Sequence, residues 1–305
     1  MLTQTKLTKE FVDCLLCGKQ GTRRFNSQLP GVVQCDCGLV YTNPRLKEEC
    51  LKDLYSREYF ESHSSEEMGY DNYVSDRELV EKTFHRRLES LEKRWLPKKG
   101  WVLDVGCATG FFLCTARSMG WSVGGVEISD YCCEYAKREF GINLFNGQFK
   151  DLDSSRAGVY DLVTMWDYIE HSFTPGRDIE KAFELLKPGG IFALATPDIG
   201  SLPAKIFKQN WVGFKEHEHL YYFTKQNLCA LLEKKGFKVV KTSYAGKYVS
   251  LGFFAKRLAG YFPWIGKVLI QMSNWPLFSK INFYCNPYDI VYVVCQKPAA
   301  DTSHR

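Results

Sequence analysis

The stretch VLDVGCATGFFL, residues 102–113, decides the fold. An apolar run ends at Asp104, a turn of small residues carries Gly106 and Gly110, and a helical pattern follows. A turn with little side-chain bulk lets a ligand approach the backbone, and the N-terminus of the next helix directs unpaired N–H groups toward it. The stretch therefore predicts a nucleotide-type binding turn between a strand and a helix.

The spacing separates two classes of binding turn. Dinucleotide-binding dehydrogenases read G-x-G-x-x-G, whereas this chain reads D-x-G-x-x-x-G. The motif resembles motif I of class I S-adenosylmethionine-dependent methyltransferases. A second acid, Glu127, ends the next apolar run, where it can accept from both ribose hydroxyls; a surface Glu after a buried strand is the alternative. The residues expected to bind the cofactor are Asp104, Gly106, Cys107, Gly110, Glu127, Ile128, Gln148, Phe149 and Trp166.

Short apolar runs and helical stretches alternate from Trp101 onward, which predicts an α/β fold with a parallel sheet covered on both faces. The third strand is expected at INLF, residues 142–145. The resemblance implies a Rossmann-like, seven-stranded, mostly parallel sheet of order 3-2-1-4-5-7-6. Similar enzymes commonly place an acid after the third strand to accept from the adenine amino group. Here Gln148 stands at that place, and its amide oxygen can accept the same bond.

Four cysteines near the N-terminus form two close pairs: Cys14 and Cys17, then Cys35 and Cys37. Four thiolates can close a tetrahedron around a structural Zn²⁺, although four buried, metal-free cysteines are the alternative. The stretch CGLVYTNPR, ending at Arg45, resembles the zinc ribbon of a bacterial methyltransferase family found in polysaccharide and sugar-modification pathways. The segment lacks a basic face interleaved with aromatic residues, so no nucleic-acid partner is expected.

The fourth apolar strand ends in WDYIEH, residues 166–171. If the segment forms a helical turn, Asp167, Glu170 and His171 project to one side. His171 or Asp167 can then serve as a general base, or all three can hold a divalent cation such as Mg²⁺. The segment resembles the E-x-x-E-H of ubiquinone-biosynthesis O-methyltransferases. His171 as a cap of the next helix is the structural alternative. Later in the chain, His217 is a further catalytic candidate, and His219 is expected to pack within its loop.

The order of motifs divides the chain into a zinc ribbon (1–45), a helical lead-in (46–96), a methyltransferase domain (97–297) and a tail (298–305) that we expect to be disordered. Residues 245–288 form an insert between the last two expected strands, and this insert is rich in aromatic residues, with Lys and Arg spaced among apolar residues. The insert can be a substrate lid, a homodimer contact or an interfacial helix that touches a membrane peripherally.

Composition is that of a soluble protein: 45% hydrophobic residues, 25% charged residues and a formal net charge of +5 over 305 residues. No signal peptide or membrane-spanning run is apparent, and the twelve cysteines are scattered, so a reducing cytoplasm is the expected compartment. The most consistent function is O-methylation of a small-molecule or glycan acceptor. The alternatives are C-methylation of a nucleotide sugar and a non-catalytic zinc-ribbon binding protein.

Overall fold

The computed structural model describes residues 8–20, 23–26, 28–50, 76–215 and 218–299. Its centre is a seven-stranded sheet whose first five strands in chain order run parallel. The last strand, β15, pairs antiparallel with both of its neighbours. From one edge to the other the strands are β8 (Phe145–Asn146), β7 (Ser122–Glu127), β6 (Trp101–Val105), β9 (Tyr160–Trp166), β10 (Leu186–Pro197), β15 (Ile290–Gln296) and β12 (Lys238–Tyr244). In chain order this is 3-2-1-4-5-7-6, so the predicted topology is confirmed.

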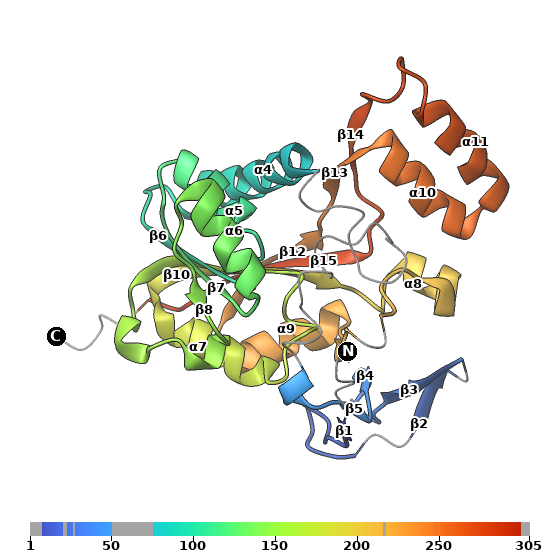
Figure 1. The fold of residues 1–305 in the computed structure, drawn as a ribbon. Coiled ribbons are helices and arrows are strands. Elements are labelled where there is room, and N and C mark those ends of the chain that lie inside the picture. Colours follow the sequence, from blue (N-terminus) through green and yellow to red (C-terminus); the bar gives the residue numbers. More distant parts are fainter. Residues whose placement is uncertain (1–7, 21–22, 27, 51–75, 216–217, 300–305) are drawn as a thin grey trace, which may run out of the picture.

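Helices cover both faces of this sheet (Figure 1). One face carries α4 (Arg77–Trp95), α5 (Phe111–Ser118) and α6 (Asp130–Phe140), and the other carries α7 (Pro175–Leu185) and α9 (Lys225–Lys234). Successive residues of β9 enter opposite cores: Leu162 packs with the first set of helices and Val163 with the second. Both faces of a parallel strand are therefore buried, which explains the continuous apolar runs in the sequence.

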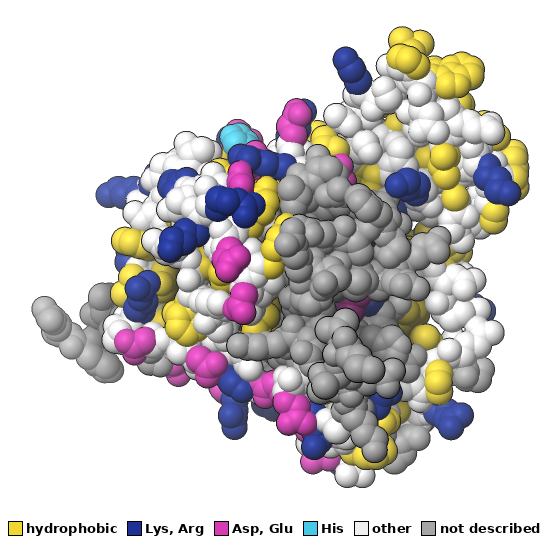
Figure 2. All heavy atoms as spheres, viewed as in Figure 1, with side chains coloured by type: hydrophobic (Ala, Val, Ile, Leu, Met, Phe, Trp, Pro, Cys, Tyr) yellow, Lys and Arg dark blue, Asp and Glu magenta, His cyan; other side chains and the backbone are white. Residues whose placement is uncertain are grey.

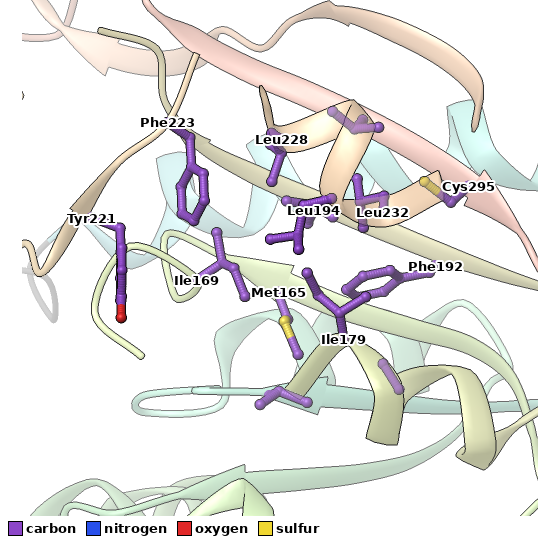
Figure 3. Packing of buried hydrophobic residues seen from close by; sticks show 14 of the residues in the cluster. Met165, Ile169, Ile179, Phe192, Leu194, Tyr221, Phe223, Leu228, Leu232 and Cys295 are labelled. Carbon is purple, nitrogen blue, oxygen red and sulfur yellow. The ribbon is translucent and has the colours of Figure 1, made fainter. Parts of the chain in front are cut away.

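The core beneath α7 and α9 is shown in Figure 3, where Met165 and Phe192 lie among leucines and isoleucines from these helices and strands. Helix α9 begins where the sequence predicts, because Thr224 accepts from the backbone N–H of Asn227 while the Asn227 side chain accepts from the Thr224 backbone. The third strand is shorter and later than predicted. Gly141 ends α6 in the left-handed conformation, and Ile142 is buried in the core instead of pairing.

The N-terminal segment forms a small antiparallel sheet of β2 (Arg23–Asn26), β3 (Leu29–Gln34) and β4 (Val40–Thr42). Its fourth strand, β11 (Tyr221–Tyr222), comes from a distant part of the sequence and pairs with β4. Beside it, β1 (Lys9–Glu10) pairs with β5 (Arg45–Leu46). Buried residues of this segment, including Leu39 and Tyr41, belong to the same core as β9 and β10. The N-terminal sheet is thus packed into the larger domain.

Residues 247–285 form an arm that projects from the rest of the molecule (Figure 1). A two-stranded hairpin of β13 (Lys247–Ser250) and β14 (Asn282–Cys285) carries two packed helices, α10 (Leu251–Tyr261) and α11 (Pro263–Ser273). The short helix α8 (Leu202–Phe207) lies against the arm, where the Phe207 and Tyr261 rings stack with centroids 3.7 Å apart. The described part of the chain contains no helix with the length and apolarity needed to cross a membrane. The remaining elements are single 3₁₀ turns at Glu48–Cys50, Phe149–Asp151, Ser154–Arg156 and Lys208–Asn210.

Candidate functional site

The turn after β6 has the open backbone that the sequence predicts. Gly106 and Gly110 have φ values of +70° and +83°, and a Cβ at Gly106 would lie 2.5 Å from the Tyr168 ring. Gly110 is the residue immediately before α5. Glycine is thus required at Gly106 both by the backbone conformation and by the neighbouring ring. A ligand can approach the main chain closely along this turn.

Glu127 holds two backbone turns together at the end of β7. One carboxylate oxygen accepts from the N–H of Ala108 and the other from the N–H of Ser129, both at 2.9 Å. The side chain is buried, and burial raises the pKa of its carboxyl group. A carboxylate can accept more than two hydrogen bonds, and Glu127 lines the adjoining cavity, so it can also accept from a ligand there.

Asp104 lies deeper, at the end of β6. Thr164 donates its hydroxyl hydrogen to the Asp104 carboxylate at 2.6 Å, and burial raises the pKa of this carboxyl to about 8. The nearby charge of Glu127 acts in the same direction. The two acids that the sequence singles out are therefore neighbours beneath one cavity.

This cavity, of about 670 Å³, lies at the carboxyl ends of the parallel strands. Gly110 does not line it; it lies behind the turn, against Ala136 of α6. The other predicted cofactor residues do line it: Asp104, Gly106, Cys107, Glu127, Ile128, Gln148, Phe149 and Trp166. These eight residues therefore share one cavity.

Glu170, His171 and His219 also line this cavity. Their ligand atoms all lie within 4.8 Å of one another. The two imidazole rings meet edge to face with centroids 4.7 Å apart, and His171 Nε2 lies 4.0 Å from Glu170 Oε1. The sequence places His219 48 residues beyond His171, so only the fold brings them together.

Backbone carbonyls fix the tautomer of both histidines. His171 Nδ1 lies 3.0 Å from the carbonyl oxygen of Glu218, and His219 Nδ1 lies 2.9 Å from that of Gly213. Because a carbonyl oxygen can only accept, each Nδ1 carries the hydrogen and each Nε2 is the basic nitrogen. Burial lowers the pKa of His171 to about 3 and that of His219 well below its ordinary value, so both rings are neutral at pH 7.

Glu170 is the buried acid of this cluster. Its Oε2 accepts from the Thr196 hydroxyl at 2.8 Å, while its buried Oε1 has no hydrogen-bond partner among the described residues. Burial, with a smaller contribution from the charge of Asp167, raises the pKa of the carboxyl to about 8. A buried, unsatisfied carboxylate oxygen beside two basic nitrogens is a place where a proton or a ligand can bind.

The structure corrects the expected grouping at WDYIEH. Asp167 has φ of +50° and the following residues form a turn, so the helical spacing that would align Asp167 with Glu170 and His171 does not exist. His219 takes the third position instead. His171 does not cap α7, because its Nδ1 faces Glu218. The other catalytic candidate, His217, lies outside the described residues.

The N-terminal sheet holds the His219 segment in place. Thr42 donates its hydroxyl hydrogen to the carbonyl of His219 at 2.8 Å and its N–H to the carbonyl of Leu220 at 2.9 Å. Leu220 and Tyr221 in turn donate their N–H groups to the carbonyl of Glu170. Strand β4 is thus joined through residues 219–221 to the acid of the cluster.

The four N-terminal cysteines converge as the sequence predicts. Cys14 lies opposite Cys37 and Cys17 opposite Cys35, with sulfur atoms 3.4 Å apart in each pair and all four sulfurs within 4.8 Å. Four thiolates 2.3 Å from a zinc ion in a tetrahedron would be about 3.8 Å apart. The donor set and spacing therefore fit Zn²⁺.

The arm contributes a wall of the cavity. Its aromatic and basic side chains line the same space as Glu127 and His171, which agrees with the substrate lid that is one interpretation of residues 245–288 from sequence. The sequence named no individual residue of the insert, because the direction of the arm depends on the β13–β14 hairpin. The residues of α10 that line the cavity are Phe253, Phe254, Arg257, Leu258 and Tyr261.

Comparisons with known proteins agree with this architecture. A family model described as a methyltransferase domain matches residues 73–242. The ubiquinone biosynthesis O-methyltransferase of Xanthomonas axonopodis pv. citri is 32% identical over 115 residues, which cover 36% of this chain and 48% of that protein. An uncharacterised protein of Methanocaldococcus jannaschii is 26% identical over 174 residues, covering 57% and 80%. The chain spans about half the length of the ubiquinone enzymes it matches.

Among solved structures, one similar chain comes from the complex between the Trm112 methyltransferase activator of Haloferax volcanii and a proposed methyltransferase. The TM-score is 0.50 at 16% identity, covering 74% of this chain and 94% of that chain. At this identity the likeness concerns the fold alone. With the family match over more than half of its length, the chain belongs to the methyltransferase domain family and has the fold of class I S-adenosylmethionine-dependent methyltransferases.

Proposed function

We propose that this protein transfers a methyl group from S-adenosylmethionine to a hydroxyl group of a small-molecule or glycan acceptor. One observation carries the proposal: a single cavity is lined both by the Gly106 turn and Glu127 and by His171 and Glu170. The first group has the donors and acceptors that a nucleoside needs. The second group has a basic nitrogen in a buried setting. The similarity to ubiquinone O-methyltransferases supports oxygen as the acceptor atom.

In this proposal Glu127 accepts from the ribose hydroxyls through the lone pairs left by its two backbone bonds. Gln148 accepts from the adenine amino group through its amide oxygen. Phe149 is buried beside it and offers an apolar surface to the base. Gly106 and Trp166 line the same cavity and would hold the methionine part of the cofactor, which would supply an electrophilic sulfonium methyl group.

The leaving group in this transfer is a neutral thioether, so the protein has to align the acceptor and remove its proton. His171 Nε2 is the proposed general base. Its pKa is low because burial disfavours the cation, and Glu170 Oε1 at 4.0 Å is the group that can stabilise the imidazolium as it forms. Burial raises the pKa of Glu170 to about 8, so the ionised fraction of this carboxyl, and with it the stabilisation of the imidazolium, grows as the pH rises through 8.

A structural zinc ion at Cys14, Cys17, Cys35 and Cys37 forms part of the proposal. The ion would fix the loops that precede β2 and β4, and through Thr42 it would support the position of His219. Nothing in the methyl transfer requires this metal directly.

A second candidate places a catalytic cation at Glu170, His171 and His219. The unsatisfied Oε1 and the two Nε2 atoms favour it, because metal-bound histidines commonly donate their other nitrogen to a carbonyl. Two imidazoles and one carboxylate suit a transition metal better than Mg²⁺, which prefers oxygen ligands. The residues present thus fit Mn²⁺, Fe²⁺ or Zn²⁺ rather than the Mg²⁺ that the sequence suggests.

The test uses S-adenosylmethionine labelled in its methyl group, a panel of phenolic, sugar and nucleotide-sugar acceptors, and three proteins: wild type, His171→Ala, and His85→Ala on the exposed face of α4. We expect label in an ether product, a 10²- to 10⁴-fold loss in His171→Ala, and no change in His85→Ala. Rate abolished by a chelator and restored by Mn²⁺ would favour the metal site. Label on carbon would mean C-methylation, and no label on any acceptor would favour a binding protein.

A further inference from the structure

The two helices of the arm bury small side chains and expose large apolar ones. Between α10 and α11 the buried residues are small: Ala255, Gly266 and Ser273. A Cβ at Gly266 would lie 2.3 Å from Ala259, so glycine lets the two helices touch. The large apolar side chains point outward instead, with Trp264 74% exposed. Ordinary packing of a helical pair buries its large residues, so the outer face of this arm is built for something else.

Exposed apolar side chains are concentrated on this arm. Of the large hydrophobic residues that are exposed in the described part of the chain, eight lie in residues 245–288 and two more lie on the adjoining α8. Single exposed hydrophobic residues are ordinary, but so large a share of them on one projecting element indicates an interaction surface. The eight in the arm are Phe262, Trp264, Val268, Trp275, Leu277, Ile281, Tyr284 and Tyr288, and the two on α8 are Leu202 and Ile206.

The charge of the arm identifies the partner. Residues 245–288 contain no Asp or Glu, although the whole chain has 35 of them, and they contain five Lys or Arg residues. Lys256, Lys267 and Lys280 are exposed beside the apolar face, and Figure 2 shows basic and hydrophobic side chains side by side on the arm. Two copies of so basic a face would repel each other. A surface that is both apolar and anionic complements it.

We propose that the outer face of the arm docks on a lipid bilayer containing anionic phospholipids. Trp264, Trp275 and Leu277 enter the interface between headgroups and acyl chains, where tryptophan is favoured. Lys267 and Lys280 contact the lipid phosphates. The apolar face and the positive charge act together, since either signal alone gives weak, reversible binding. The arm is peripheral, and it brings the mouth of the cavity next to the membrane, because Phe253 and Tyr261 on its inner side line that cavity.

The test is flotation of the full-length protein with vesicles of phosphatidylcholine alone and of phosphatidylcholine with 30 mol% phosphatidylglycerol, the latter fraction being roughly that needed for a strong negative surface. We expect binding to the anionic vesicles, weakening as salt is raised. The double variants Trp264→Ser/Trp275→Ser and Lys267→Glu/Lys280→Glu should each lose binding by at least about tenfold. Trp101→Ser is the matched control, since Trp101 is 45% exposed at the start of the interior strand β6, outside the arm.

Thermal melting in the presence of S-adenosylhomocysteine separates loss of binding from loss of folding, because none of the four arm positions lines the cavity. Wild-type protein that stays off anionic vesicles would overturn the proposal, as would variants that bind them as well as wild type. Light scattering that finds a dimer in wild type and a monomer in Trp264→Ser/Trp275→Ser, without lipid binding, would assign the face to a second copy of the chain. These outcomes do not depend on whether the acceptor proposed above is correct.

Discussion

Replacing Glu127 by Gln tests the cofactor end of the cavity most directly. The two carboxylate oxygens accept from Ala108 N and Ser129 N at 2.9 Å, so whichever oxygen becomes an amide NH₂ will face a backbone donor. One loop bond is lost and, if Glu127 binds the ribose, one hydroxyl loses a charged acceptor. Bonds to charged groups contribute about 1.5–3 kcal/mol each. Because the loop bond belongs to folding stability, only the ribose bond is counted, and the cofactor affinity should fall by about 1.5–3 kcal/mol, which is roughly 10- to 150-fold.

The assay is isothermal titration of S-adenosylhomocysteine into wild type, Glu127→Gln and Glu139→Gln, which removes an exposed acid on the outer side of α6. Chemical unfolding of each protein in the absence of ligand measures the part of the loss that comes from the loops alone. An affinity of Glu127→Gln within a factor of three of wild type would refute the ribose assignment, even if the variant is less stable. A loss in Glu139→Gln of the same size would show that charge alone, and not position, is responsible.

Three further predictions concern other parts of the molecule. Metal analysis should find one zinc per chain, lost in Cys17→Ser and kept in Cys229→Ser on α9; a folded wild type without metal would contradict the ribbon. Thr42→Val should lower the free energy of unfolding by about 1–3 kcal/mol and reduce kcat, while cofactor affinity stays unchanged. The control is Thr242→Val, at an exposed position of β12, which should change neither stability nor kcat. Burial lowers the pKa of His171 from 6.5 to about 3. As the pH falls, the His171 ring is therefore protonated in the unfolded chain at a higher pH than in the folded protein, which favours unfolding. Urea unfolding should thus show a free energy of unfolding that declines between pH 6.5 and 3. That decline should be shallower in His171→Gln, and equal slopes would contradict the buried neutral ring.

Much of the fold could be predicted because its signals are local. The Gly106 turn, the helix start at Thr224 and the cysteine pairs are each set by neighbouring residues, and the structure has them where the sequence places them. The cluster of Glu170, His171 and His219 could not be predicted in the same way. It depends on the left-handed backbone of Asp167 and on a long-range contact between His171 and His219, and neither has a periodic signature. The arm was recognised as an insert, but its direction follows from tertiary packing alone.

The pairing of β11 with β4 has a consequence for how the protein is made. Tyr221 pairs with Tyr41, so the N-terminal sheet receives its last strand 180 residues after the strand beside it. At 5–20 residues per second, a ribosome needs roughly 10 to 40 seconds to deliver it. During that time Val40 and Tyr41 form an open edge, which is a template for pairing with other chains. A chain that ended before residue 221 would retain the four cysteines of the N-terminal segment but would leave the β4 edge unpaired.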